Sequence, residues 1–269
     1  MKHFSIDHLT LLLLLGVLCV LPFTVTGYVL YIVNLLMVFV VLALGMHIVI
    51  GEAGQFALSH TAFYGLGIYT AGLINTLWHP PLVLSVLAGG LLSAVLGYLI
   101  GFLALRMRDI YLALATFSFG EAMQWVFLNW ESVTGGSNGM RMQPAEMFGL
   151  KLTNDIQAYP FVIGLAALML WITVALSRSQ FGSALRAVRE SDVAALAMGI
   201  NVRSMKLAAF SISAAFAGIA GGLGALNFEI VTAEVVGAGR SGAYLLFTFL
   251  GGATFFFGPI IGAILMIIA

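Results

Sequence analysis

Residues 178–206 read Arg178-Ser-Gln-Phe-Gly-Ser-Ala-Leu-Arg-Ala-Val-Arg-Glu-Ser-Asp-Val-Ala-Ala-Leu-Ala-Met-Gly-Ile-Asn-Val-Arg-Ser-Met-Lys206, and they separate two apolar runs, 160–177 and 207–228. Seven of the 22 charged side chains of the chain (11 basic and 11 acidic) fall in this one segment. The segment is also rich in alanine, which favours a helix. A short charged helix between two apolar runs is typical of a multi-pass membrane protein that offers this helix to a partner outside the bilayer.

The composition places the whole chain in the membrane class. Of its 269 residues, 61% are hydrophobic, and the mean hydropathy is +1.08, so lipid must be the solvent. The net charge is zero, which excludes a nucleic-acid-binding protein. Cys19 is the single cysteine, so the sequence predicts no internal disulfide and no cysteine-based metal site. No other metal-ligating pattern is visible.

The hydropathy pattern predicts an all-α, polytopic transmembrane helix bundle of about 8–10 spans, because about 20 apolar residues cross the hydrocarbon core. We expect one transmembrane domain over residues 1–269, with broken or re-entrant helices. The first run is either a retained span or a signal-peptide core. The last run is one kinked span or two half-spans, and because it ends while still apolar we expect a truncated chain. The candidate spans are 9–27, 28–50, 61–77, 82–105, 110–130, 160–177, 207–228 and 242–269.

Two interruptions are too polar to face lipid. Residues 51–60 read Gly-Glu-Ala-Gly-Gln-Phe-Ala-Leu-Ser-His, and we expect a loop or a broken helix covered by protein, as irregular backbone at membrane depth requires. Residues 229–241 are similar. Small residues recur at a spacing of four, which predicts closely packed helices. The clearest series is Ala214, Gly218 and Gly222.

The distribution of Lys and Arg predicts the orientation. With the N-terminus inside, the inner segments 1–8, 106–109 and 178–206 hold eight of the 11 basic residues. Residues 131–159 then form an external loop, and residues 178–206 form a cytoplasmic segment.

Polar residues inside the apolar runs are candidates for a translocation path. Ser118, Glu121 and Gln124 are three apart, so they form one polar strip on a helix. A carboxylate within the membrane is expensive, so Glu121 is either functional or a structural hydrogen-bonding group. Gln55, Phe56 and His60 belong to a second cluster around the break at 51–60. His60 is either a ligand or proton relay, or a histidine hydrogen-bonded within the helix break.

The sequence argues against an enzyme. Gly239-Arg240-Ser241-Gly242 matches the Gly-x-Ser-Gly pattern of intramembrane serine proteases, but no histidine follows Ser241 to act as its base. A phosphate-binding loop is also missing, because none of the three lysines lies in a Gly-x4-Gly-Lys context. The chain therefore cannot hydrolyse ATP alone, and we expect no cofactor of its own.

Five stretches, in order, resemble the longer permease subunit of branched-chain (hydrophobic) amino acid ABC importers. They cover most of the chain, from residue 51 to residue 263. The segment directly after Arg240 departs from the family, which more often has an uncharged serine-rich stretch there, and the role of Arg240 stays open. The stretches are 51–70, 112–121, Thr134-Gly-Gly-Ser-Asn-Gly139, 184–192 running into Gly199-Ile-Asn201, and Gly251-Gly252 followed by 258–263.

The resemblance implies a permease that pairs with a second homologous permease, two cytoplasmic ATPase subunits that bind ATP and Mg²⁺, and a periplasmic substrate-binding protein. It places the chain in the bacterial inner (plasma) membrane, surrounded by lipid. Segment 178–206 becomes the coupling helix that docks on an ATPase. Its Ala-Ala-x3-Gly core resembles the coupling loop of ABC importers, although Val193 stands where a glutamate is usual. The implied coupling residues are Arg186, Arg189, Glu190, Asp192, Ala194, Ala195 and Gly199.

The implied function is ATP-driven alternating access for leucine, isoleucine or valine. We expect Arg186 and Arg189 to face acidic groups on the ATPase, and Gly199 to turn the end of the helix. Three alternatives stay open: a urea or short-amide permease of the same type, a secondary transporter that uses Glu121 as a proton site, and a structural membrane scaffold. The sequence does not identify the cargo, nor whether the two permeases are identical.

Overall fold

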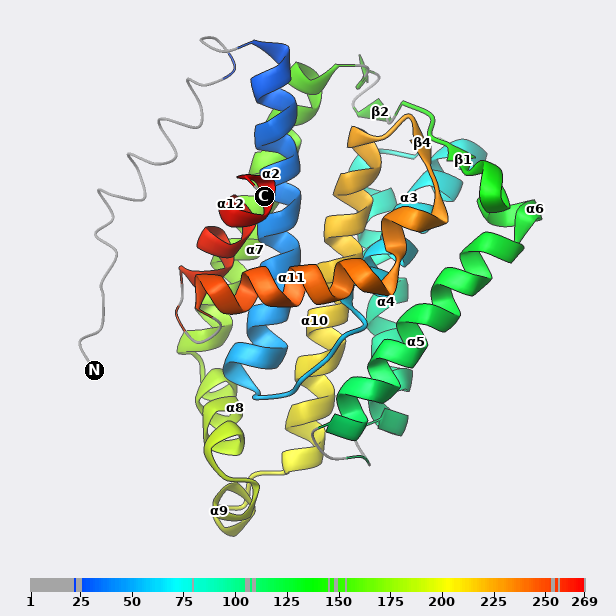
Figure 1. The fold of residues 1–269 in the computed structure, drawn as a ribbon. Helices are drawn as coiled ribbons and strands as arrows, with labels where there is room; N and C mark the ends of the chain where they lie inside the picture. The colour runs from blue at the N-terminus through cyan, green and yellow to red at the C-terminus, as the bar shows by residue number, and fades with distance from the viewer. Residues whose placement is uncertain are drawn as a thin grey trace.

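The computed structural model describes residues 22, 26–78, 80–104, 107, 110–144, 146–147, 150–152, 154–252, 255 and 257–268. Over these residues the chain is a helix bundle with two short antiparallel ribbons at one end, which confirms the predicted all-α membrane fold (Figure 1). The helices are α2 (Gly27–Met46), α3 (His60–Trp78), α4 (Leu82–Ala104), α5 (Ile110–Asn129), α6 (Glu131–Thr134), α7 (Asp155–Arg178), α8 (Gln180–Glu190), α9 (Asp192–Ala197), α10 (Val202–Gly224), α11 (Ala238–Gly251) and α12 (Gly258–Ile268). One π-helix and three 3-10 turns are η1 (His47–Glu52), η2 (Gly136–Asn138), η3 (Ala225–Asn227) and η4 (Ala233–Val236). The ribbons pair β1 (Met140–Arg141) with β4 (Ile230–Val231), and β2 (Glu146–Met147) with β3 (Leu150–Lys151).

Four helical stretches in the described part of the chain are long and apolar enough to cross a membrane: Gly27–Glu52, Leu82–Ala104, Asp155–Arg178 and Val202–Asn227. At about 1.5 Å per residue, such helices exceed the ~30 Å hydrocarbon core. Helices α3 and α5, of 19 and 20 residues, lie beside them. The predicted span 9–27 falls almost entirely outside the described residues, so the total number of spans stays a prediction.

Helix α10 is the centre of the bundle and packs against α4, α3 and α2. Its small residues allow this, as the series Ala214, Gly218 and Gly222 predicted. A Cβ atom added at Gly218 would lie 2.6 Å from the carbonyl oxygen of Gly89, and one at Gly222 would lie 2.9 Å from Val86 Cα. Backbones in contact at this range leave no room for larger side chains, so the glycines set the distance between the helices.

The predicted interruption at 51–60 is present and lies inside the protein. Helix α2 ends in the π-helical turn η1, an extended stretch follows, and α3 begins at His60. Residues 47–53 are buried, as are Ala57 and Ser59. Helix α10 packs against η1, so protein covers most of the break, whereas Gly54 and Phe56 are exposed.

The two ends of the bundle carry the two segments that the charge pattern assigned to opposite sides. Helix α6 and the ribbons lie at one end, and α8 and α9 lie at the other (Figure 1). Residues 229–237 are irregular, as expected, and contain β4 and η4, whereas 238–241 form the first turn of α11.

The predicted final run 242–269 is divided into α11 and α12, which have 14 and 11 residues. Each is too short to cross the ~30 Å core alone, so of the two predicted forms the structure shows two half-spans. Helix α11 lies across the bundle at mid-height, where it contacts α2, α3 and α5 (Figure 1).

Candidate functional site

The break at 51–60 contacts α5, the helix that carries the polar strip. The backbone N–H of Leu58 donates a hydrogen bond of 3.0 Å to Thr116 Oγ1 on α5. Thr116 in turn donates to the Leu112 carbonyl oxygen. Thr116 is buried, whereas Ser118 and Glu121 are exposed, so this contact joins the break to the helix but not to the polar strip itself.

The predicted strip opens onto the surface of this chain. Ser118 and Glu121 are exposed, and the Ser118 hydroxyl donates to the Leu114 carbonyl oxygen of its own helix. Gln124 is half-buried. Its Nε2 would lie 3.2 Å from a Cβ atom added at Gly237, the residue between η4 and α11, so Gln124 lies against this junction. Glu121 therefore lies on an exposed face of α5. A charged side chain there is favourable only if water or another protein covers this face, because a charge in lipid is costly.

Phe56 extends this exposed face across to α11. It is 49% exposed, and its ring stacks on that of Phe249 with the centroids 5.7 Å apart. Phe249 was not predicted, because no local pattern indicates which residue of a distant helix meets Phe56. Arg240, at the start of α11, is exposed.

His60 is a buried bridge between three helices. Ser213 Oγ on α10 donates to the Gly45 carbonyl oxygen of α2 at 2.6 Å, and it lies 2.6 Å from His60 Nε2. Since the single hydroxyl proton is used toward Gly45, Nε2 must carry the proton and donate to Ser213. This arrangement favours the hydrogen-bonded alternative over the ligand or proton relay.

Gln55 is also buried, with 4% of its surface exposed. Neither atom of its side-chain amide has a hydrogen-bond partner among the described residues. Gln55 thus faces inward, while its neighbour Phe56 faces outward, so the two predicted path residues lie on opposite sides of the break.

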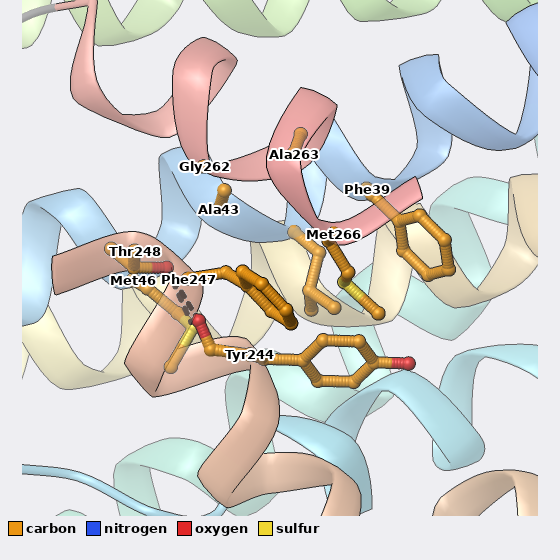
Figure 2. A pocket seen from close by; sticks show the side chains of 10 residues that line it. Phe39, Ala43, Met46, Tyr244, Phe247, Thr248, Gly262, Ala263 and Met266 are labelled. Carbon is orange, nitrogen blue, oxygen red and sulfur yellow. Dashed lines mark hydrogen bonds between the residues drawn. The ribbon is translucent and has the colours of Figure 1, made fainter. Parts of the chain in front are cut away.

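A crevice lies between α2, α11 and α12, but its lining is apolar (Figure 2). Its Thr248 hydroxyl is already used, because it donates to the Tyr244 carbonyl oxygen at 2.8 Å. Such a lining offers little to an ammonium or a carboxylate group. The crevice is lined by Phe39, Leu42, Ala43, Met46, Tyr244, Phe247, Thr248, Gly262, Ala263 and Met266.

At the end of the bundle opposite α6 and the ribbons, the two arginines of α8 bind the break. Arg186 Nη1 donates to Glu52 Oε2 at 2.9 Å, and Arg189 Nη1 donates to the Gly51 carbonyl oxygen at 2.5 Å. Gly54 has a φ of +68°, and a Cβ atom there would lie 2.7 Å from Arg189 Cγ. The structure thus gives both arginines partners within the chain, where the sequence analysis expected partners on an ATPase.

Two further basic residues of the segment are also engaged within the chain. Lys206 donates to Asp192 Oδ2 at 2.6 Å, and the Arg203 guanidinium lies 4.6 Å from the centre of the Phe102 ring. The first contact joins α9 to the start of α10, and the second joins the start of α10 to the end of α4.

Gly199 ends α9 as expected, with a φ of +82°. The N–H of Ile200 bonds to the Ala195 carbonyl oxygen, and the N–H of Gly199 bonds to that of Leu196. These two bonds form a Schellman motif, which requires the left-handed conformation at Gly199. Ser191 caps the other end, where its hydroxyl accepts the N–H of Ala194.

The outer surface of α9 is apolar. Val193, Leu196 and Met198 are 77%, 60% and 67% exposed, whereas Ala195 is buried against Val188 and Val202. We call these three exposed residues the α9 patch. The sequence analysis missed the patch because it looked for partner contacts among the charges. The available signal was Val193, an apolar residue where an acidic one was expected.

Comparison with known proteins agrees with this picture. Residues 28–269 match the family model described as branched-chain amino acid transport system / permease component. The chain is similar to the high-affinity branched-chain amino acid transport system permease protein LivM of Escherichia coli (strain K12), with 34% identity over 92% of this chain and 64% of that protein. It is also similar to the protein of that name from Salmonella typhimurium (strain LT2), with 32% identity over 98% of this chain and 68% of that protein.

The chain spans about two thirds of the length of these relatives. No solved structure matches it. The family match covers nearly all of the chain, including every helix described above except the first residue of α2. The chain therefore belongs to the family of branched-chain amino acid transport permease components, and it is a multi-pass membrane protein.

Proposed function

We propose that the chain is the permease subunit of an ABC importer that carries branched-chain amino acids across the bacterial inner membrane by alternating access. ATP hydrolysis in partner subunits drives the cycle. The observation that supports this most is the α9 patch, an apolar surface on a helix pair that Arg186, Arg189 and Lys206 hold to the bundle. An exposed apolar surface of this kind is typical of a site for another protein.

The proposed partners are two cytoplasmic ATPases, a second homologous permease and a periplasmic substrate-binding protein. An ATPase docks on α8 and α9. The second permease covers the exposed face of α5 and α11, where Glu121 and Phe56 lie. The binding protein meets the opposite end, which holds α6 and the ribbons.

The proposed path for the amino acid follows that same exposed face. A branched-chain amino acid has a zwitterionic head and an apolar tail, so its path needs few polar groups among apolar ones. Ser118, Glu121 and Gln124 supply the polar groups, and Phe56 and Phe249 supply the apolar surface.

Reconstitution tests the function directly. We expect the complete complex in liposomes to take up labelled leucine only with ATP inside and the loaded binding protein outside. Uptake by the permease alone, driven by a pH gradient, would instead identify a secondary transporter. Competition by urea or short amides, but not by valine or isoleucine, would identify the other cargo.

The two ends of the bundle are expected on opposite sides of the membrane. Ser183 on α8 and Ser137 in η2 are both exposed, so single cysteines there, in a Cys19→Ser background, report the topology. An impermeant maleimide added to spheroplasts should label position 137 and leave position 183 unlabelled until the membrane is broken. Labelling of position 183 in intact spheroplasts would reject the orientation.

Glu121→Gln is expected to lower uptake about tenfold at normal expression, because one charge-assisted hydrogen bond contributes about 1.5–3 kcal/mol. Glu121→Asp keeps the carboxylate at the same position, so it is the matched control and should retain most of the uptake. Wild-type uptake rates for Glu121→Gln would show that its charge takes no part in transport.

A further inference from the structure

The break is in contact with α8 on one side and with the exposed face on the other. We define the break segment as residues 51–61. Its first residues bind α8 through the Arg186–Glu52 ion pair and the Arg189–Gly51 hydrogen bond, at 2.9 and 2.5 Å. The Glu52 side chain is only 12% exposed, and His47 Nε2 lies 3.8 Å from its other oxygen. A carboxylate with so little access to water depends on these partners.

The remaining residues of the break segment bind the helices that form the exposed face. Leu58 is hydrogen-bonded to Thr116 on α5, and Phe56 stacks on Phe249 of α11. The N–H and the hydroxyl of Thr61 are both hydrogen-bonded to the Ser241 hydroxyl at the start of α11. One short segment therefore connects α8 to α5 and α11, which make no comparable contacts with α8 themselves.

The middle of the break segment has features of a segment that adopts more than one conformation. Residues 54–59 belong to no helix or strand, and η1 before them is π-helical, a form common at functional sites. The Gln55 amide is buried and unpartnered within the described part of the chain. A buried polar group without partners is unfavourable, so this arrangement does not satisfy every group in the segment.

We infer that Glu52 and Arg186 are positioning residues that join α8 to the break segment, so that a displacement of α8 reaches Phe56, α5 and α11. Their role in transport rests on the proposed function, in which an ATPase moves α8 and α9. The connection itself is a property of the permease and can be measured without cargo or nucleotide.

The first measurement is hydrogen exchange of the intact permease in nanodiscs. We expect Arg186→Glu to speed exchange of the amides of residues 53–55 and 58 about tenfold, since all four are hydrogen-bonded in the break segment. Glu52→Arg should do the same, and the double variant should restore slow exchange. Arg178→Glu, a charge reversal at the exposed end of α7, is the matched control and should leave these amides unchanged.

The second measurement is ATP hydrolysis by the reconstituted complex with the loaded binding protein. Each single reversal should lower the stimulated rate about tenfold while the ATPases still co-purify, and the double variant should recover to within about threefold. Glu52→Gln keeps the shape of the side chain but removes its charge, so it tests the ion pair even if a charge-reversal variant does not fold. We expect it to lower stimulation about threefold.

The outcomes separate this inference from the proposed function. Unchanged exchange and unchanged stimulation in Arg186→Glu and Glu52→Gln would overturn the connection. If both single reversals lose stimulated ATP hydrolysis and the double variant assembles but does not recover it, the Glu52–Arg186 pairing would be overturned. A wild-type complex that no branched-chain amino acid stimulates would refute the proposed function, whereas the exchange result would still decide whether α8 and the break segment are joined.

Discussion

Gly221→Leu is expected to prevent accumulation of the folded permease. A Cβ atom at position 221 on α10 would overlap the Tyr64 carbonyl oxygen of α3 and would lie 2.9 Å from the backbone nitrogen of Ile68. Because the obstacles are backbone atoms, no change of rotamer relieves them, and we expect a cost of more than about 3 kcal/mol. Size-exclusion chromatography of a fluorescent fusion in detergent measures the folded fraction.

Gly164→Leu is the matched control for this change. Gly164 lies on the exposed side of α7, and an added Cβ there meets no atom within 4 Å. Its leucine variant should elute and melt like the unmodified protein. A normal elution profile for Gly221→Leu would mean that α3 and α10 do not cross as closely as described.

Val193→Asp combined with Leu196→Asp is expected to abolish ATPase docking. If both side chains are buried in the complex, each contributes roughly 1.5–3 kcal/mol of apolar burial, so their loss weakens docking more than a hundredfold. Co-purification of the ATPases and substrate-stimulated hydrolysis should fall together, while the permease still inserts, because both residues are exposed.

Val193→Ile with Leu196→Met keeps the α9 patch apolar and should keep both docking and stimulation. This conservative pair separates a need for apolar surface from a need for these particular side chains. Normal co-purification of the aspartate variant would show that the ATPase does not depend on the α9 patch for docking.

Local patterns in the sequence were enough to predict the long helices and the interruption at 51–60, but not the division of the charged segment into α8 and α9. The polar run at 51–60 indicated the break because lipid excludes unsatisfied backbone, and Gly199 indicated a turn because glycine adopts a positive φ without strain. The series Ala214, Gly218 and Gly222 indicated close packing. Each of these features depends on residues that are neighbours in the chain.

Pairings between distant residues could not be predicted in this way. Arg186 and Glu52 are 134 positions apart, and Thr61 and Ser241 are 180 positions apart. In a membrane protein the lipid face and the interior are both apolar, so hydropathy does not show which face of α5 turns outward. The orientation of α11 across the bundle could not be predicted for the same reason, because the hydropathy of a short apolar helix resembles that of part of a full span.

The π-helical turn at His47–Glu52 makes the number of residues in this turn a constraint on the structure. A π-helical turn holds an extra residue relative to an α-helix, so a deletion within it would narrow the turn and change which side chains lie beside Gly51 and Glu52. Such a deletion would alter the contacts of Glu52 with Arg186 and of Gly51 with Arg189 together, whereas a substitution alters them one at a time.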